Sequence, residues 1–245
     1  MATVLLLRHG RTSANADGVL AGWSDVDLDE TGQQQVKAAA ERLRDVPLRA
    51  VLTSPLRRCR QTVDTVLEAR PGLTAVVDER LGECRYGDWE GQRLEQLAAD
   101  PLWQVVQRHP AAAVFPGAGG ESMAAVAARA VEAIRQTDAR IDAEHGVDAI
   151  WLACSHGDVI KAIVADALGV HLDLFQRIVV DPGSVTAIRH TPFRPFLMRL
   201  NDTGGDLAGL VRPAPPGVAE GDAAVGGGAP AAANLPGEEV SGAAE

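Results

Sequence analysis

Two short apolar runs, each followed by a histidine and a glycine, constrain the fold of this chain most. Residues 4–7 are entirely apolar and lead into Arg8-His9-Gly10, while residues 149–154 lead into Ser155-His156-Gly157. Continuous apolar runs of this length are typical of central strands that are covered on both faces. In open α/β sheets, ligands bind just beyond the carboxyl ends of the strands. The sequence therefore predicts two buried strands that carry His9 and His156 to the reactive edge of a sheet.

Strands and helices are predicted to alternate along the rest of the chain. The other expected strands are residues 51–53, 75–78, 185–188 and 196–200, and the last two form a closing hairpin. The expected helices are residues 32–45, 55–69, 123–145 and 157–168. This order predicts an α/β fold, a three-layer sandwich with a largely parallel central sheet flanked by helices.

Capping residues predict where three of these helices begin. Thr31 with Gln34 forms a capping box before the first helix. Ser54 is expected to be the N-cap of the second helix, with Pro55 in its first turn. Ser122 is expected to cap the longest helix, in which apolar residues recur at helical spacing.

The last part of the chain, residues 204–245, differs in composition from the rest. It contains no aromatic residue, is dominated by alanine, glycine and proline, and has six acidic residues against one arginine. A segment of this kind buries too little apolar surface to fold. We expect one globular domain over residues 1–203, followed by a disordered acidic tail over residues 204–245.

Charge and cysteine content narrow the class of protein. The net charge is −10, of which the tail carries −5 and the body −5. A mildly acidic body argues against a nucleic-acid or membrane partner. The three cysteines are far apart and form no C-x-x-C pair, so neither a disulfide framework nor a zinc site is expected. The apolar runs are too short for a signal peptide or a membrane span, and a cytoplasmic location is therefore expected.

Four segments at predicted strand ends carry charged or reactive side chains. They contain Arg8 with His9, the group Arg57, Arg58 and Arg60, then Glu83, and finally His156. Each residue alone is a weak signal. Their recurrence at the same place in the topology indicates a catalytic site.

Five motifs around these residues resemble the histidine phosphatase superfamily, in the branch that holds cofactor-dependent phosphoglycerate mutase. The motifs are Leu7-Arg8-His9-Gly10-Arg11-Thr12-Ser13-Ala14-Asn15, Gly22-Trp23-Ser24-Asp25-Val26-Asp27-Leu28, Ser54-Pro55-Leu56-Arg57-Arg58-Cys59-Arg60-Gln61-Thr62, Gly82-Glu83-Cys84-Arg85-Tyr86-Gly87-Asp88-Trp89-Glu90-Gly91 and Ser155-His156-Gly157. They occur in the family's order, and the resemblance runs from residue 4 to about residue 200.

The resemblance implies a role for each motif in phosphoryl transfer. It implies that His9 becomes a phosphohistidine and that Glu83 donates a proton to the leaving group. It also implies that Arg8, Arg58 and His156 hold the phosphoryl oxygens. The remaining implied substrate-binding residues are Asn15, Gly22, Tyr86 and Gly157.

These residue types suit the chemistry. A neutral imidazole can attack phosphorus when a hydrogen bond fixes its tautomer. Guanidinium groups and a second histidine stabilise negative charge on the transferred phosphoryl group, so no metal ion or other cofactor is expected. A carboxyl that stays protonated near neutral pH can protonate the leaving alkoxide and later accept a proton from water.

Departures from the mutase pattern favour hydrolysis of small phosphomonoesters. Residue 11 is arginine, where mutases of this branch carry an acidic or amide residue. Between Gly91 and Ser122 the cationic candidates are Arg93, Arg108 and His109, too few to hold a phosphorylated acid while it reorients. A phosphomutase that uses the same site and a non-catalytic phospholigand-binding module stay open as alternatives. A homodimer also stays open.

Some features are given no part in the chemistry. Residues 101–120 form either an ordinary helix packed on the domain or a lid that contacts substrate. The histidines expected at the solvent-exposed surface are His109, His145, His171 and His190. The sequence carries no cysteine–histidine pairing signal, and thiol catalysis is therefore disfavoured.

Overall fold

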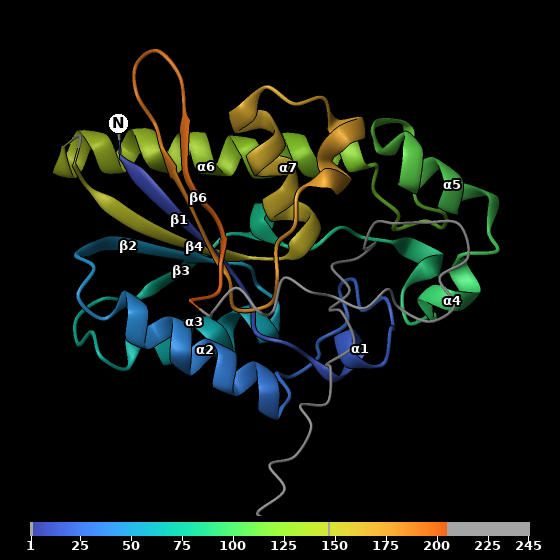
Figure 1. Cartoon of the computed structure of the whole chain (residues 1–245), viewed down its shortest axis with the longest axis horizontal. Helices are drawn as coiled ribbons and strands as arrows, with labels where there is room; N and C mark the ends of the chain where they lie inside the picture. The colour runs from blue at the N-terminus through green and yellow to red at the C-terminus, as the bar shows by residue number, and fades with distance from the viewer. Residues whose placement is uncertain (1, 147, 205–245) are drawn as a thin grey trace, which may run out of the picture.

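The computed structural model describes residues 2–146 and 148–204. The predicted tail therefore lies outside the described residues, apart from Gly204. The model matches the expected α/β sandwich, because helices cover both faces of a single six-stranded sheet (Figure 1).

The sheet has the strand order β3-β2-β4-β1-β5-β6. Its strands are β1 (Thr3–Arg8), β2 (Leu48–Thr53), β3 (Ala75–Val77), β4 (Ile150–Ser155), β5 (Val185–Arg189) and β6 (Phe196–Asp202). The first four pair in parallel, whereas β5 runs antiparallel to β1 and forms a hairpin with β6. The predicted strands, their largely parallel arrangement and the closing hairpin are confirmed.

Four helices form the outer layers, with α2 and α3 on one face of the sheet and α6 and α7 on the other (Figure 1). Their bounds are α2 (Glu30–Leu43), α3 (Arg57–Leu67), α6 (Met123–His145) and α7 (Gly157–Leu168). The shorter helices are α1 (Ser13–Ala16), α4 (Leu94–Leu97), α5 (Pro101–Arg108) and the 3₁₀ turns Glu79–Leu81, Gly87–Trp89, Pro110–Ala112 and Leu172–Arg177. Two buried apolar clusters, one on each face, hold these layers together.

The starts of α2 and α3 differ from the prediction. The N-cap of α2 is Asp29, whose carboxylate accepts a hydrogen bond from the Gly32 amide at 2.7 Å. Thr31 therefore lies inside the helix, and the predicted capping box is wrong because an acidic cap is available two residues earlier. Helix α3 begins at Arg57, so Ser54 is not its N-cap and Pro55 is not in its first turn.

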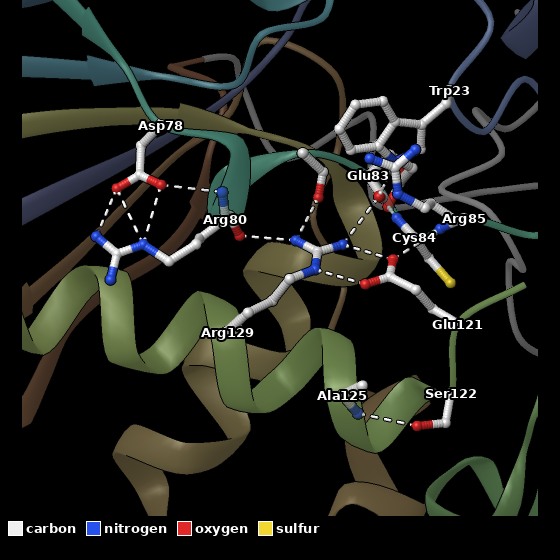
Figure 2. Close-up of polar contacts among 11 residues, drawn as sticks. Trp23, Asp78, Arg80, Glu83, Cys84, Arg85, Glu121, Ser122, Ala125 and Arg129 are labelled. Atoms are coloured by element: carbon white, nitrogen blue, oxygen red, sulfur yellow. Dashed lines mark hydrogen bonds and ion pairs between the residues drawn. The ribbon is translucent and has the colours of Figure 1, made fainter. Parts of the chain in front are cut away.

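The start of α6 is as predicted. Ser122 caps the helix by accepting a hydrogen bond from the Ala125 amide at 3.1 Å (Figure 2). The helix ends before Gly146. Gly146 has a φ of 87°, a left-handed conformation that favours glycine.

Residues 101–120 pack on the domain as an ordinary helix and its following loop. Trp103 and Val106 of α5 and Phe115 of the loop are buried in the main apolar cluster. The loop is further fixed by the Asp88 amide, which donates a hydrogen bond to the Pro116 carbonyl at 2.9 Å. Within residues 2–146 and 148–204, no helix combines the length and apolar character needed to cross a bilayer.

Candidate active site

Three parallel strands end level with one another and bring their next residues together. In the register of the sheet, Arg8 of β1 pairs with Ser155 of β4, and Thr53 of β2 pairs with Cys154 of β4. His9, His156 and Ser54 follow these strands directly. The ring centroids of His9 and His156 are 5.1 Å apart. The predicted meeting of the two histidines at one sheet edge is confirmed.

The hydrogen bonds of His9 define its tautomer. Its Nδ1 lies 2.7 Å from the Gly10 carbonyl oxygen, which can only accept, so Nδ1 carries the proton. Its Nε2 accepts a hydrogen bond from Nε of Arg58 at 3.3 Å and therefore bears a lone pair. Burial, reinforced by Arg58 and Arg8, lowers the pKa of His9 well below its usual range. His9 is thus a neutral imidazole whose Nε2 lone pair can act as a nucleophile.

Gly10 lets the neighbouring helix approach His9 closely. A Cβ atom at Gly10 would lie 2.4 Å from the carbonyl oxygen of Gly32 in the first turn of α2. On the other side, the Gly10 amide donates a hydrogen bond to the Thr62 hydroxyl of α3 at 3.3 Å. The segment that carries His9 is therefore fixed between α2 and α3.

Arg58 is the arginine of its group that enters the site. Its side chain is buried, and its guanidinium donates hydrogen bonds to the carbonyls of Gly22 at 2.8 Å and Ser24 at 3.0 Å. Gly22 has a φ of 51°, and a Cβ atom there would collide with the carboxylate of Glu90. The side chains of Arg57 and Arg60 are 53% and 51% exposed, as expected for surface charges.

Arg8 and His156 are the other buried basic residues of the site. Arg8 donates a hydrogen bond to the Val180 carbonyl at 2.6 Å. Nε2 of His156 lies 2.7 Å from the Ser54 hydroxyl and 3.5 Å from the Cys59 sulfur. Burial and then the nearby Arg58 lower the pKa of His156 well below its usual range. Because His156 precedes Gly157, the first residue of α7, its ring stands at the N-terminus of that helix.

Glu83 is a buried carboxyl that retains its proton near neutral pH. Burial, with a further contribution from Asp158, raises the pKa of Glu83 to about 7, although Arg58 opposes the shift. One carboxyl oxygen accepts a hydrogen bond from the Cys84 amide at 3.0 Å. An acid of this strength can donate a proton to a leaving group at neutral pH.

Asp158 and Lys161 are buried charged residues that the sequence analysis missed. Asp158 accepts a hydrogen bond from the Tyr86 hydroxyl at 2.9 Å, and Nζ of Lys161 lies 3.5 Å from its other oxygen. Tyr86 is itself fully buried against Phe115. The signal in the sequence was the presence of two charges in a helix that is otherwise apolar over residues 157–165.

Two residues of the first motif lie in local networks. The side-chain oxygen of Asn15 accepts hydrogen bonds from the backbone amide and the hydroxyl of Thr12, at 3.1 and 2.9 Å. The guanidinium of Arg11 donates to Asp29 at 2.7 Å and to Thr31 at 2.8 Å. The start of α2 therefore engages Arg11, and the preference for hydrolysis drawn from the identity of residue 11 stays a prediction.

The expected exposure of His190 was wrong. His190 is only 15% exposed, and its Nδ1 lies 3.3 Å from a carboxylate oxygen of buried Asp138. The Cys59 sulfur lies 3.5 Å from Nε2 of His156, a contact for which the sequence carried no signal. Both contacts join residues from distant parts of the chain, which local sequence patterns do not report.

The family model of the histidine phosphatase superfamily (branch 1) matches residues 4–203. A glucosyl-3-phosphoglycerate phosphatase of Mycolicibacterium vanbaalenii is 34% identical over 173 residues, 69% of this chain and 76% of the relative. A 2,3-bisphosphoglycerate-dependent phosphoglycerate mutase 2 of Gloeobacter violaceus is 27% identical over 192 residues, 78% of this chain and 86% of the relative.

The solved structures agree with these sequence matches. The structure of a mycobacterial glucosyl-3-phosphoglycerate phosphatase in complex with VO3 superposes with a TM-score of 0.71 at 31% identity, and the match covers 82% of this chain and 98% of that one. The fold and the site define an α/β enzyme with a histidine at its centre. The chain belongs to the histidine phosphatase superfamily, whose members among these relatives are phosphatases and phosphoglycerate mutases.

Proposed function

We propose that this enzyme hydrolyses small phosphomonoesters through a phosphohistidine on His9, with Glu83 as the proton donor. The observation that carries the proposal is the state of His9, which is neutral, has Nδ1 fixed on Gly10 and directs Nε2 at the guanidinium of Arg58. A phosphoryl group held by Arg58 would therefore meet a nitrogen lone pair.

Two displacements complete the reaction. In the first, Nε2 of His9 bonds to phosphorus, the phosphorus–oxygen ester bond breaks, and the leaving oxygen takes the Glu83 proton. In the second, the Glu83 carboxylate takes a proton from water, the oxygen of that water bonds to phosphorus, and the phosphorus–nitrogen bond breaks. Glu83 is then protonated again and inorganic phosphate leaves. Arg8, Arg58 and His156 stabilise the phosphoryl oxygens in both steps.

The substrate class is inferred from the relatives and from the charges around the site. These relatives are named as a phosphoglycerate mutase and a glucosyl-3-phosphoglycerate phosphatase, so the names point to small phosphorylated acids. Hydrolysis is favoured because all three cationic candidates between Gly91 and Ser122 are engaged or exposed. Arg93 donates a hydrogen bond to the Asp17 carbonyl, Arg108 is exposed, and His109 is 72% exposed. A phosphomutase using the same site is the second candidate, since several relatives are named as phosphoglycerate mutases.

The reaction is proposed to need no metal ion, and the protein to be cytoplasmic. Two buried arginines, Arg8 and Arg58, supply the positive charge that a metal would otherwise provide, and neutral His156 adds a hydrogen-bonding group. The cysteines are free and buried, which suits a reducing compartment.

Labelling of His9 tests the proposal. Brief reaction with a ³²P-labelled phosphomonoester should give an acid-labile, base-stable label that is absent from His9→Ala, and vanadate should inhibit turnover. Phosphate release should continue after treatment with EDTA. Full activity of His9→Ala would refute the proposal, and isomerised product without phosphate release would establish the mutase instead.

A further inference from the structure

We propose that Arg129 of α6 is a positioning residue that holds Glu83 at the angle needed to protonate the leaving group. The inference deepens the proposed function and rests on Glu83 as the proton donor. Arg129 lies in the second turn of α6 and outside the motifs that the sequence analysis identified. Figure 2 shows its guanidinium beneath the segment that carries Glu83.

Every N–H group of the Arg129 guanidinium has a partner. One terminal nitrogen donates to the carbonyls of Arg80 and Gly82, at 2.7 and 2.8 Å. The other donates to the Glu83 carbonyl and to Glu121, both at 2.9 Å. Nε donates to the second oxygen of Glu121 at 2.8 Å. These five bonds use the full donor capacity of an arginine, and three of them end on the backbone around Glu83.

Glu121 extends the same network to the far side of Glu83. Its carboxylate accepts a hydrogen bond from the Arg85 amide at 2.9 Å, while its own amide donates to the Arg85 carbonyl at 2.9 Å. Burial acts to raise the pKa of Glu121, but the hydrogen bonds from Arg129 and the Arg85 amide outweigh it and lower this pKa, so the carboxylate stays ionised. Arg129 and Glu121 together fix the backbone on both sides of Glu83. We call this pair of side chains the donor clamp.

The donor clamp matters because no regular element holds Glu83. The residue lies in a loop between two 3₁₀ turns, outside the sheet ladder. Besides the clamp, the Trp23 indole donates to the Glu83 carbonyl at 2.6 Å, and the Ser155 hydroxyl donates to the Leu81 carbonyl at 2.7 Å. The carboxyl of Glu83 in turn accepts from the next backbone amide, that of Cys84. A shift of this backbone would therefore turn the acid away from the leaving oxygen.

Leaving groups of different basicity separate this role from general structural support. An alkyl phosphate needs a proton on its leaving oxygen, whereas 2,4-dinitrophenyl phosphate expels a stable anion without one. We expect Arg129→Met to lower kcat/KM for an alkyl phosphate by about 10- to 100-fold, a part of the roughly 10²- to 10⁴-fold that general acid catalysis contributes, and for the dinitrophenyl ester by less than about threefold. Arg129→Lys, which keeps the charge but fewer donors, should fall between.

A matched control and a double variant complete the experiment. Arg135→Met removes an exposed arginine of the same helix, one bound to Asp166, and should leave both substrates unaffected. In a Glu83→Gln background, Arg129→Met should cause no further selective loss. An equal loss for both esters, or a selective loss that persists without Glu83, would overturn the positioning role. If Glu83→Gln itself shows no dependence on the leaving group, the proposed function fails first, so the two failures are distinguishable.

Discussion

The two halves of the site are held in different ways. His9, His156 and Ser54 follow parallel strands that end level, so the backbone ladder of the sheet fixes their positions. Glu83 lies in a loop whose carbonyls are held by the side chains of Arg129 and Trp23. The phosphate side of the site therefore depends on topology, whereas the acid side depends on a few long side chains. Substitutions in the two halves should therefore change the kinetics in different ways.

Loss of Arg58 should have the largest effect on the phosphate side. Arg58→Met removes a buried cation from the His9 nitrogen, so we expect kcat/KM to fall by about 10²- to 10³-fold, as when an oxyanion donor is lost. The fall should be similar for alkyl and dinitrophenyl esters, because both transfer the same phosphoryl group. The neighbouring Arg57→Met, at an exposed ion pair with Asp27, should change little. A loss confined to the alkyl ester would contradict this division.

The titration of Glu83 should define the acid side. With an alkyl phosphate, kcat/KM should decline as the pH rises through about 7, because the donor loses its proton, and Glu83→Gln should lack this limb. Steady-state kinetics between pH 5 and 9 would show the decline in the wild type and its absence in Glu83→Gln.

The same raised pKa makes a prediction for stability. A carboxyl with a folded pKa of about 7 and an unfolded value near 4.5 binds more protons in the folded state, so its contribution to stability is lost as the pH rises between them. The free energy of unfolding of the wild type should fall relative to Glu83→Gln by about 2 kcal/mol from pH 5 to pH 8. Urea unfolding at pH 5 and pH 8 measures this difference. An equal change in the free energy of unfolding for the wild type and Glu83→Gln would be inconsistent with the raised pKa.

Ser54 should show the smallest effect. Ser54→Ala removes the hydroxyl that lies 2.7 Å from Nε2 of His156, so kcat/KM should fall by about fivefold, the equivalent of one hydrogen bond of ~1 kcal/mol. Ser122→Ala removes a serine of another kind, the N-cap of α6, and should cost ~1 kcal/mol of stability while leaving kcat/KM unchanged. If Ser54→Ala loses stability alone, the hydroxyl does not orient His156.

Local patterns predicted the parts of the molecule that depend on local physics. The apolar runs identified β1 and β4, the helical spacing after Ser122 identified α6, and the strand ends located His9 and His156. Helix starts were less secure, because Asp29 and Thr31 both suit an N-cap, and in the structure it is Asp29 whose carboxylate accepts the hydrogen bond from the Gly32 amide.

The sequence alone therefore determined the order of strands and helices and the residues at the strand ends. The family resemblance pointed to Arg58, but the tertiary structure decided that Arg58 is buried while Arg57 and Arg60 are exposed. It also decided that Ser54 faces His156 and that Arg129 holds the Glu83 loop. The spacing of apolar residues repeats every few positions, so a short stretch of sequence is enough to predict a strand or a helix. The contact between Arg129 and Glu83 joins residues 46 positions apart, and only the stacking of α6 against the sheet brings them together.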